Sequence, residues 1–123
     1  MIVQEGTDEA MIAAINAAPR AMVFLTVPWS GPERTARANF REAVARLAEI
    51  GLQVEAFAVD EESDVGQGWL SSLGLLVTFD GVGVPEGWGA VLWLEHGRVV
   101  WRIGRGIDER VVGIISRSKA LWQ

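Results

Sequence analysis

The sequence predicts an α/β fold with a central, mixed β-sheet flanked by helices on both faces. Residues 21–27 (Ala-Met-Val-Phe-Leu-Thr-Val) form an apolar run that is typical of a strand buried on both sides. A second β-rich run, 52–59, ends at Asp60. Between them, apolar residues recur at helical spacing over 34–50, and Gly51 is suited to end that helix. These segments predict a β-α-β unit with parallel strands.

The C-terminal part predicts a hairpin followed by a helix. Residues 90–94 and 99–103 both have strand composition, and residues 95–98 (Glu-His-Gly-Arg) place a glycine where a tight turn needs positive φ. This antiparallel pair makes the sheet a mixed one. Asp108 is suited to cap a last helix whose apolar face extends to Trp122.

The remaining segments give weaker patterns. A first helix is predicted over 7–18, with Thr7 as its cap and Pro19 as its end. The other expectations are an edge strand at 1–3, a short helix at 68–73, a short strand or packed loop at 75–79, and glycine-rich turns at 80–89.

Composition excludes several classes of protein. The 123 residues are half apolar, which favours a single domain over 1–123 with a conventional core. A net charge of −5 argues against nucleic acid as a partner, and no apolar run reaches the roughly 20 residues that span a bilayer. The acidic N-terminus lacks the features of a secretory signal, so we expect a cytoplasmic location. Without cysteine there is no disulfide, thiolate metal site or thiol nucleophile.

The most informative stretch lies between the first apolar run and the helix that follows it. It reads Trp29-Ser30-Gly31-Pro32-Glu33. In its place between strand and helix it resembles the active-site turn of the thioredoxin-like family, which carries Trp-Cys-Gly-Pro-Cys. The order of elements along nearly the whole chain is similar to that family. The resemblance therefore implies a thioredoxin-like fold in which Ser30 and Glu33 occupy the two cysteine positions.

This departure decides what chemistry is possible. The family's first cysteine attacks as a thiolate activated at a helix N-terminus, and the second resolves the mixed disulfide. The Ser30 hydroxyl stays protonated near neutral pH, and Glu33 cannot resolve a disulfide. We therefore expect a redox-inactive member of the family that is not a disulfide oxidoreductase.

Ser30 and Glu33 have two interpretations each. Ser30 either caps the helix or donates its hydroxyl to a bound group, as in glutathione-transferase-like relatives of the fold, and capping is the commoner use. Glu33 is expected to favour the positive end of the helix dipole over acid/base work. The charged pairs of this helix are expected on a solvated face. Nucleophilic use of Ser30 would need His96 as base, but about five strand residues at roughly 3.3 Å each separate that histidine from the turn.

The family also carries a cis-proline before the third main strand, and two positions compete for it here. Counting back from the hairpin turn places Gly89 there, whereas Gly83-Val84-Pro85 resembles the usual Gly-Ile-Pro. We favour a rebuilt loop. Trp88 beside this loop could form an interaction surface with Trp29, or both could simply pack in the interior.

Four carboxylates fall within residues 60–64, but the spacing of a calcium loop is missing, which favours a solvated acidic loop. The sequence predicts no metal, no cofactor and no catalytic residue. The leading hypothesis is a protein- or peptide-binding, chaperone-type assembly module. The alternatives are a small glutathione- or thiol-binding, transferase-like enzyme that uses Ser30, and a homo-oligomer subunit. The expected docking surface comprises Trp29, Ser30, Gly31, Pro32, Glu33, Pro85, Trp88 and Gly89.

Overall fold

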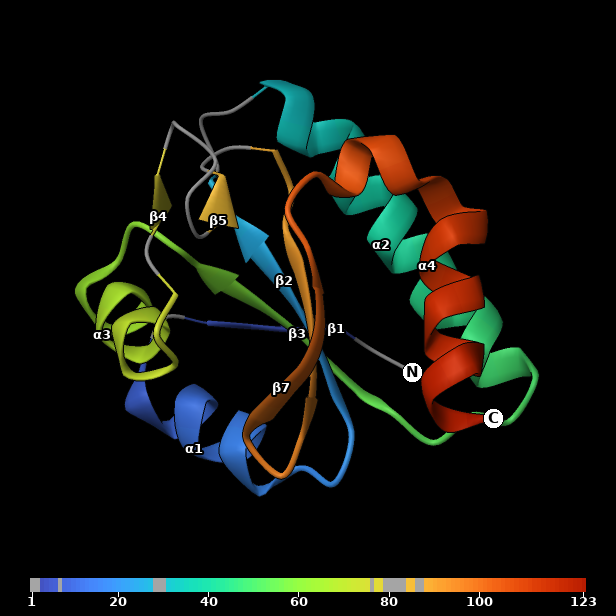
Figure 1. The fold of residues 1–123 in the computed structure, drawn as a ribbon, viewed down its shortest axis with the longest axis horizontal. Helices are drawn as coiled ribbons and strands as arrows, with labels where there is room; N and C mark the ends of the chain where they lie inside the picture. Colours follow the sequence, from blue (N-terminus) through green and yellow to red (C-terminus); the bar gives the residue numbers. More distant parts are fainter. Residues whose placement is uncertain (1–2, 7, 28–30, 76, 79–83, 86–87) are drawn as a thin grey trace.

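A computed structural model describes residues 3–6, 8–27, 31–75, 77–78, 84–85 and 88–123 (Figure 1). In chain order its elements are β1 (Val3–Gly6), α1 (Glu9–Ala17), β2 (Ala21–Thr26), α2 (Gly31–Glu49), β3 (Glu55–Asp60), α3 (Asp64–Ser72), β4 (Val77–Thr78), β5 (Val84–Pro85), β6 (Val91–Glu95), β7 (Arg98–Ile103) and α4 (Gly106–Trp122).

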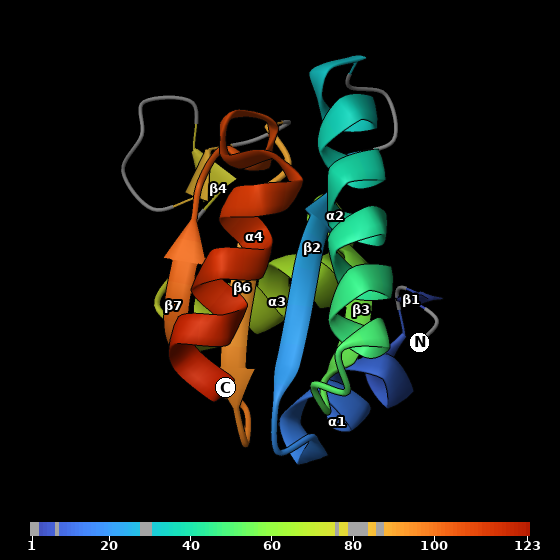
Figure 2. The ribbon, with the colours of Figure 1, turned by 90° about the vertical axis from the view of Figure 1, so that its right-hand side faces the viewer.

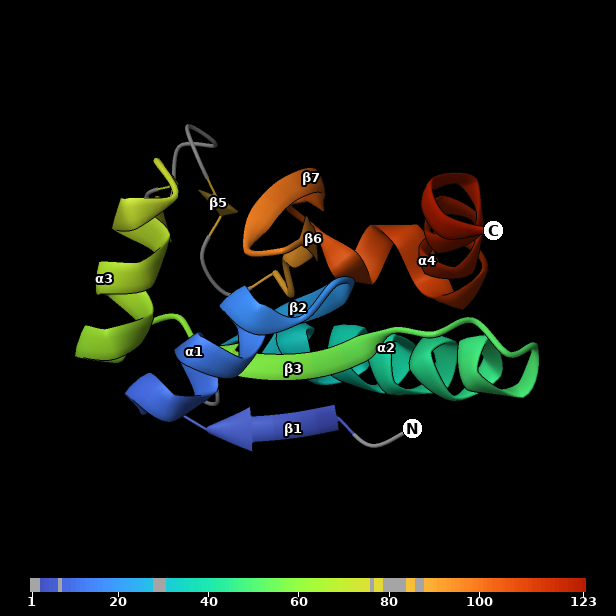
Figure 3. The ribbon, with the colours of Figure 1, turned by 90° about the horizontal axis from the view of Figure 1, so that it is seen from below.

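The main sheet is mixed, as expected. Its five strands lie in the order β1-β3-β2-β6-β7. β1 and β2 both pair parallel with β3, while β6 pairs antiparallel with β2 and β7 antiparallel with β6. Figure 3 shows β1 and β7 at the two edges of this sheet. β4 and β5 form a separate parallel pair in which Thr78 lies opposite Pro85.

Helices cover both faces of the sheet, which confirms the predicted fold class. α2 and α4 lie side by side on one face (Figure 2), over a core that includes Phe24, Phe40 and Trp93. α1 and α3 lie on the other face, over a core that includes Phe57 and Trp69. β2 is completely buried from Ala21 to Phe24, as its apolar sequence predicts.

All four helix starts differ from the prediction. α2 begins at Gly31, three residues before the expected start at 34. α1 is capped by Asp8, whose Oδ1 accepts the Met11 N–H at 2.9 Å, while Thr7 lies outside the described residues. α3 begins at Asp64, four residues before the expected start, because the Ser63 hydroxyl caps it by accepting the Gly66 N–H at 3.0 Å.

α4 begins at Gly106, two residues before the predicted cap, Asp108. The cap residue is Arg105, whose side chain makes no capping hydrogen bond. Inside this helix Arg110 has φ 59° and ψ −179°, so the helix is kinked there. Only glycine adopts this region readily, so the kink holds Arg110 under backbone strain.

The turn between β6 and β7 has the predicted geometry. His96 and Gly97 have φ 50° and 77°, the two successive positive values of a type I′ hairpin turn. The edge strand was expected at 1–3. β1 occupies Val3–Gly6, and residues 1 and 2 lie outside the described part.

Candidate functional site

The site is the point where β2 leads into α2. β2 ends at Thr26 and α2 begins at Gly31, which is the predicted strand-turn-helix arrangement. Beside it β3 also ends, and the Glu61 N–H donates to the Thr26 carbonyl at 3.1 Å. Trp29 and Ser30 lie outside the described residues, so their predicted roles stay predictions. Pro32 falls within the first turn of α2.

Glu33, in the first turn of α2, is buried, with only 2% of its surface exposed. Its Oε1 accepts a hydrogen bond from the Thr26 hydroxyl at 2.6 Å, and the Arg37 Nη2 lies 2.8 Å from the same oxygen. Arg37 Nε also donates to Oε1, at 3.2 Å, and Nη2 lies 3.1 Å from Oε2. The expectation that this ion pair lies on a solvated face was therefore wrong for Glu33.

Thr26, Glu33 and Arg37 form a closed set of contacts, because Arg37 Nη2 also donates to the Thr26 hydroxyl oxygen. A buried carboxylate is tolerated only when it is paired and hydrogen-bonded, and this set supplies both. It ties the first turn of α2 to the end of β2. The carboxylate at the position of the family's second cysteine is thus occupied by structural contacts.

A tight backbone approach lies next to this set. Gly89 has φ 72°, and a Cβ there would lie 2.4 Å from the Ala36 Cβ on α2. The Gly106 N–H donates to the Gly89 carbonyl at 2.9 Å, and a Cβ on Gly106 would lie 2.2 Å from that oxygen. Both positions therefore need glycine, and the two helices α2 and α4 converge on Gly89.

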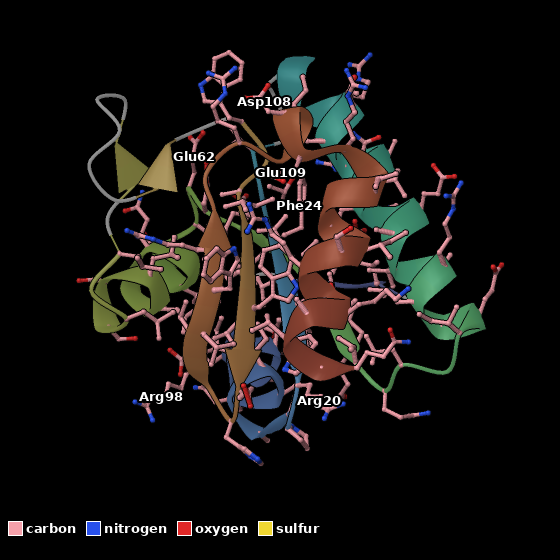
Figure 4. All side chains as sticks on the ribbon, turned by 45° about the vertical axis from the view of Figure 1, so that its right-hand side comes forward. Arg20, Phe24, Glu62, Arg98, Asp108 and Glu109 are labelled. Atoms are coloured by element: carbon pink, nitrogen blue, oxygen red, sulfur yellow. The ribbon has the colours of Figure 1, made fainter. Side chains whose placement is uncertain are left out.

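Trp88 precedes this contact and is partly exposed. The Arg105 guanidinium carbon lies 4.0 Å from the Trp88 ring centroid, and Arg105 Nε donates to Asp108 Oδ2 at 2.6 Å. A guanidinium at this distance over an indole is a cation–π contact. Figure 4 shows Asp108 at the end of the molecule where α2 begins. This end therefore presents an indole held in place by an arginine.

Of the two candidates for the cis-proline position, Gly89 lies two residues before the start of β6 and against α2. The adjacent Ala90 carbonyl accepts the Leu25 N–H at 2.9 Å. Pro85 lies instead in the small β4–β5 pair. No peptide bond is cis in the parts of the chain that the structure describes, which include Val84 and Pro85.

His96 lies at the far end of the sheet. Its N–H donates to the Ala18 carbonyl at 3.1 Å, next to the start of β2, whereas the α2 turn follows the end of β2. Arg98 and Arg20 mark this opposite end in Figure 4. The structure thus keeps the only histidine away from the turn.

The acidic stretch comprises the last residue of β3, a turn, and the cap and first residue of α3, and Glu62 and Asp64 are exposed as predicted. Asp60 Oδ1 accepts the Glu62 N–H at 2.9 Å, and the Ser63 hydroxyl donates to the Asp60 carbonyl at 2.8 Å. Glu61 is buried, with 1% of its surface exposed, which contradicts its prediction as a solvated residue. Within the described ranges no three His, Cys, Asp or Glu side chains lie close enough to hold a metal ion. In the same part of the chain no helix has the length and apolar character needed to cross a bilayer.

Sequence reasoning missed Thr26, Arg105 and Asp108 as parts of this site. Thr26 gave a signal, since it is the only polar residue in the run 21–27. Arg105 gave none, because its contact with Trp88 depends on how α4 reaches Gly89.

No protein-family model matches this chain, and neither does any curated protein. Several solved structures are similar to it in fold. The oxidised thioredoxin from Plasmodium falciparum matches with a TM-score of 0.68 at 13% identity, over 94% of this chain and 97% of that one. Oxidised thioredoxin O2 from Arabidopsis thaliana gives 0.68 at 15% identity, over 98% and 95%.

Zinc-bound human ERp44 gives a TM-score of 0.70 at 14% identity, over 97% of this chain but 31% of that chain. This chain therefore spans less than a third of ERp44. All three identities are low, so the likeness is one of fold. It confirms the thioredoxin-like α/β fold that the turn sequence and the order of elements imply.

Proposed function

We propose that this chain is a redox-inactive thioredoxin-like protein that binds an extended segment of a partner protein, as an assembly or chaperone-type module. A cysteine-free chain has neither a thiolate nor a disulfide to exchange. We call the proposed binding region the turn surface and define it by Trp29, Ser30, Gly31, Pro32, Pro85 and Trp88. Glu33 and Gly89, which were also expected on it, are buried and support it from beneath.

The burial of Glu33 is the observation that supports this function best. Its carboxylate is 2% exposed and held by Thr26 and Arg37, at the position where the family resolves disulfides. Such a group stabilises the helix start, and its contacts with Thr26 and Arg37 leave almost none of it exposed to a substrate. The frame of strand and helix is thus maintained without cysteine, which fits a surface used for binding.

Trp88 supplies the recognition chemistry in this proposal. Its indole is partly exposed and positioned by Arg105, which is in turn paired with Asp108. Tryptophan and arginine are enriched among the residues that dominate binding energy at protein interfaces. An indole held in one orientation also loses little entropy on binding.

A peptide library displayed on phage tests the proposal. We expect selected peptides to bind wild-type protein and to lose about tenfold or more in affinity with Trp88→Ala, which corresponds to roughly 1.4 kcal/mol. Trp29→Ala should have a comparable effect. Ile50→Ala is the control, because Ile50 is a large apolar side chain, 50% exposed, that follows the far end of α2.

Peptides that bind the Trp88→Ala and Trp29→Ala variants as well as wild type would rule out the turn surface. Calorimetry with glutathione addresses the enzyme alternative: micromolar binding that Ser30→Ala abolishes would favour a thiol-binding, transferase-like protein instead. Insulin reduction by a dithiol should not exceed the blank in any variant.

A further inference from the structure

The edge strand β7 offers a second surface, on a different part of the molecule from the turn surface. β7 is the last strand of the five-stranded sheet, and β6 is its only partner among the described strands. Figure 3 shows it at the opposite edge from β1. The outer backbone N–H and C=O groups of such a strand are available to pair with another strand.

A hollow of about 330 Å³ follows this edge and is lined by the consecutive residues Val99, Val100, Trp101 and Arg102. Successive side chains of a strand point to opposite faces of the sheet. Alternation is interrupted at Val100, which has no partner on β6 because the register shifts between Trp93 and Leu94, so the hollow follows a bulged part of the strand edge. The hollow leaves β7 open at the place where the backbone of an additional strand would lie.

Trp101 gives this edge an aromatic anchor. It lies opposite Trp93 in the register of β6 and β7, yet 46% of it is exposed while Trp93 is fully buried. The Arg117 guanidinium carbon of α4 lies 5.1 Å from the Trp101 ring centroid. A large exposed indole next to a cation is a strong contact for a residue on an added strand.

The C-terminal part of the chain, which comprises β7 and α4, carries a net charge of opposite sign to that of the part before it. Residues 98–123 contain five arginines and the only lysine but two acids, whereas residues 1–97 contain fourteen acids and five arginines. On β7 itself, Arg98 and Arg102 are exposed, and neither forms an ion pair with another described residue. Figure 4 shows Arg98 at the hairpin end of the strand.

These charges select between two occupants of the edge. A second copy pairing through β7 would bring the arginines of both copies into one seam, and like charges facing across strands destabilise pairing. An acidic segment would meet the same arginines with complementary charge.

We propose that β7 binds an extended, acidic segment of a partner protein by strand addition, with Trp101 as the anchor and Arg98 and Arg102 selecting for carboxylates. In this mode the backbone hydrogen bonds supply affinity and alternate side chains supply specificity. The proposal does not depend on the turn surface.

The probe is a peptide of six residues, the length of β7, in which glutamate alternates with valine. In an NMR titration we expect its chemical-shift changes to centre on Val99–Arg102, and the outward amides of β7 to exchange more slowly. Arg102→Glu should weaken binding about tenfold or more, and Trp101→Thr, which preserves strand propensity, by a similar factor.

The matched control is Arg46→Glu, because Arg46 lies on α2 and is 53% exposed. This variant should leave the affinity for the peptide unchanged. Trp88→Ala should also have no effect, which separates this edge from the turn surface. The same peptide with lysine in place of glutamate should not bind.

Three results would overturn the proposal: equal binding of the lysine peptide, shift changes confined to other elements, or an unchanged affinity in the correctly folded Arg102→Glu variant. A dimer in sedimentation equilibrium that Trp101→Thr dissolves would assign the edge to a second copy instead.

Discussion

The starts of α2 and α4 carry similar charge patterns in very different surroundings. In α2, Glu33 and Arg37 form an i,i+4 ion pair, and Glu33 is 2% exposed. At α4, Arg105 and Asp108 form an i,i+3 pair with side chains 49% and 61% exposed. Buried pairs cost much when one partner is removed, whereas exposed pairs contribute little. The spacing of the residues along the helix identifies an ion pair in both places. Contact with a neighbouring strand decides how much that pair contributes to stability.

The largest effect is expected where the two helices converge. Gly89→Ala should destabilise the protein by about 3 kcal/mol, because it adds left-handed strain and a Cβ that would lie 2.4 Å from that of Ala36. Urea unfolding measures this loss. Gly51→Ala is the matched control, since Gly51 has a similar φ of 78° but open space around its Cβ position, so strain alone should cost about 1 kcal/mol. Equal losses of unfolding free energy in the two variants would show that Ala36 does not crowd a Cβ at position 89.

The buried pair itself gives the next effect. Arg37→Leu leaves the Glu33 carboxylate buried beside Thr26 alone, and we expect a loss of about 2 kcal/mol in the free energy of unfolding. This value is reduced from the usual range because Arg37 is 34% exposed and water can partly replace it. Denaturant titration near neutral pH measures it, and a change below about 0.5 kcal/mol would show that the burial of Glu33 needs no partner.

The kink in α4 predicts a substitution that increases the stability of the protein. Arg110→Gly should stabilise the protein by about 1 kcal/mol, because glycine adopts φ 59° without strain. Val112→Gly, two residues further along and 70% exposed, should instead lose about 1 kcal/mol as an ordinary helix position. Thermal unfolding of both variants compares the signs, and a loss at both sites would mean that Arg110 carries no strain.

The exposed pair gives the smallest effect. Arg105→Leu should change stability by less than about 0.5 kcal/mol, since both partners lie in solvent. The same variant should reduce peptide binding at the turn surface, because Trp88 loses the guanidinium that positions it. The substitution would then lower the affinity for the peptide without a matching loss of stability. A large loss of stability would show that the starts of α2 and α4 are energetically alike.

The sequence predicted the fold well because the signals that define it are local. The apolar run of β2, the helical period of α2 and the His96-Gly97 turn each reveal their structure within a few neighbours. Their order along the chain then leaves few topologies.

The site was less predictable because its contacts are long-range. Glu33 reads as a surface residue until Thr26 is known to lie beneath it. Asp108 reads as a helix cap, but the approach of Gly106 to Gly89 starts α4 two residues earlier and leaves Asp108 to pair with Arg105. Backbone proximity between distant glycines leaves no periodic trace in the sequence.

The distribution of indoles makes the two layers optically separable. Trp93 lies under α4, and its Nε1 donates to the Ser118 hydroxyl of that helix at 2.9 Å. Trp69 lies in the core on the opposite face, on α3. In variants in which Trp93 or Trp69 is the only one of the six tryptophans that remains, a red shift in emission would report solvent reaching that layer alone. The order in which the faces open during unfolding can then be followed without an added dye.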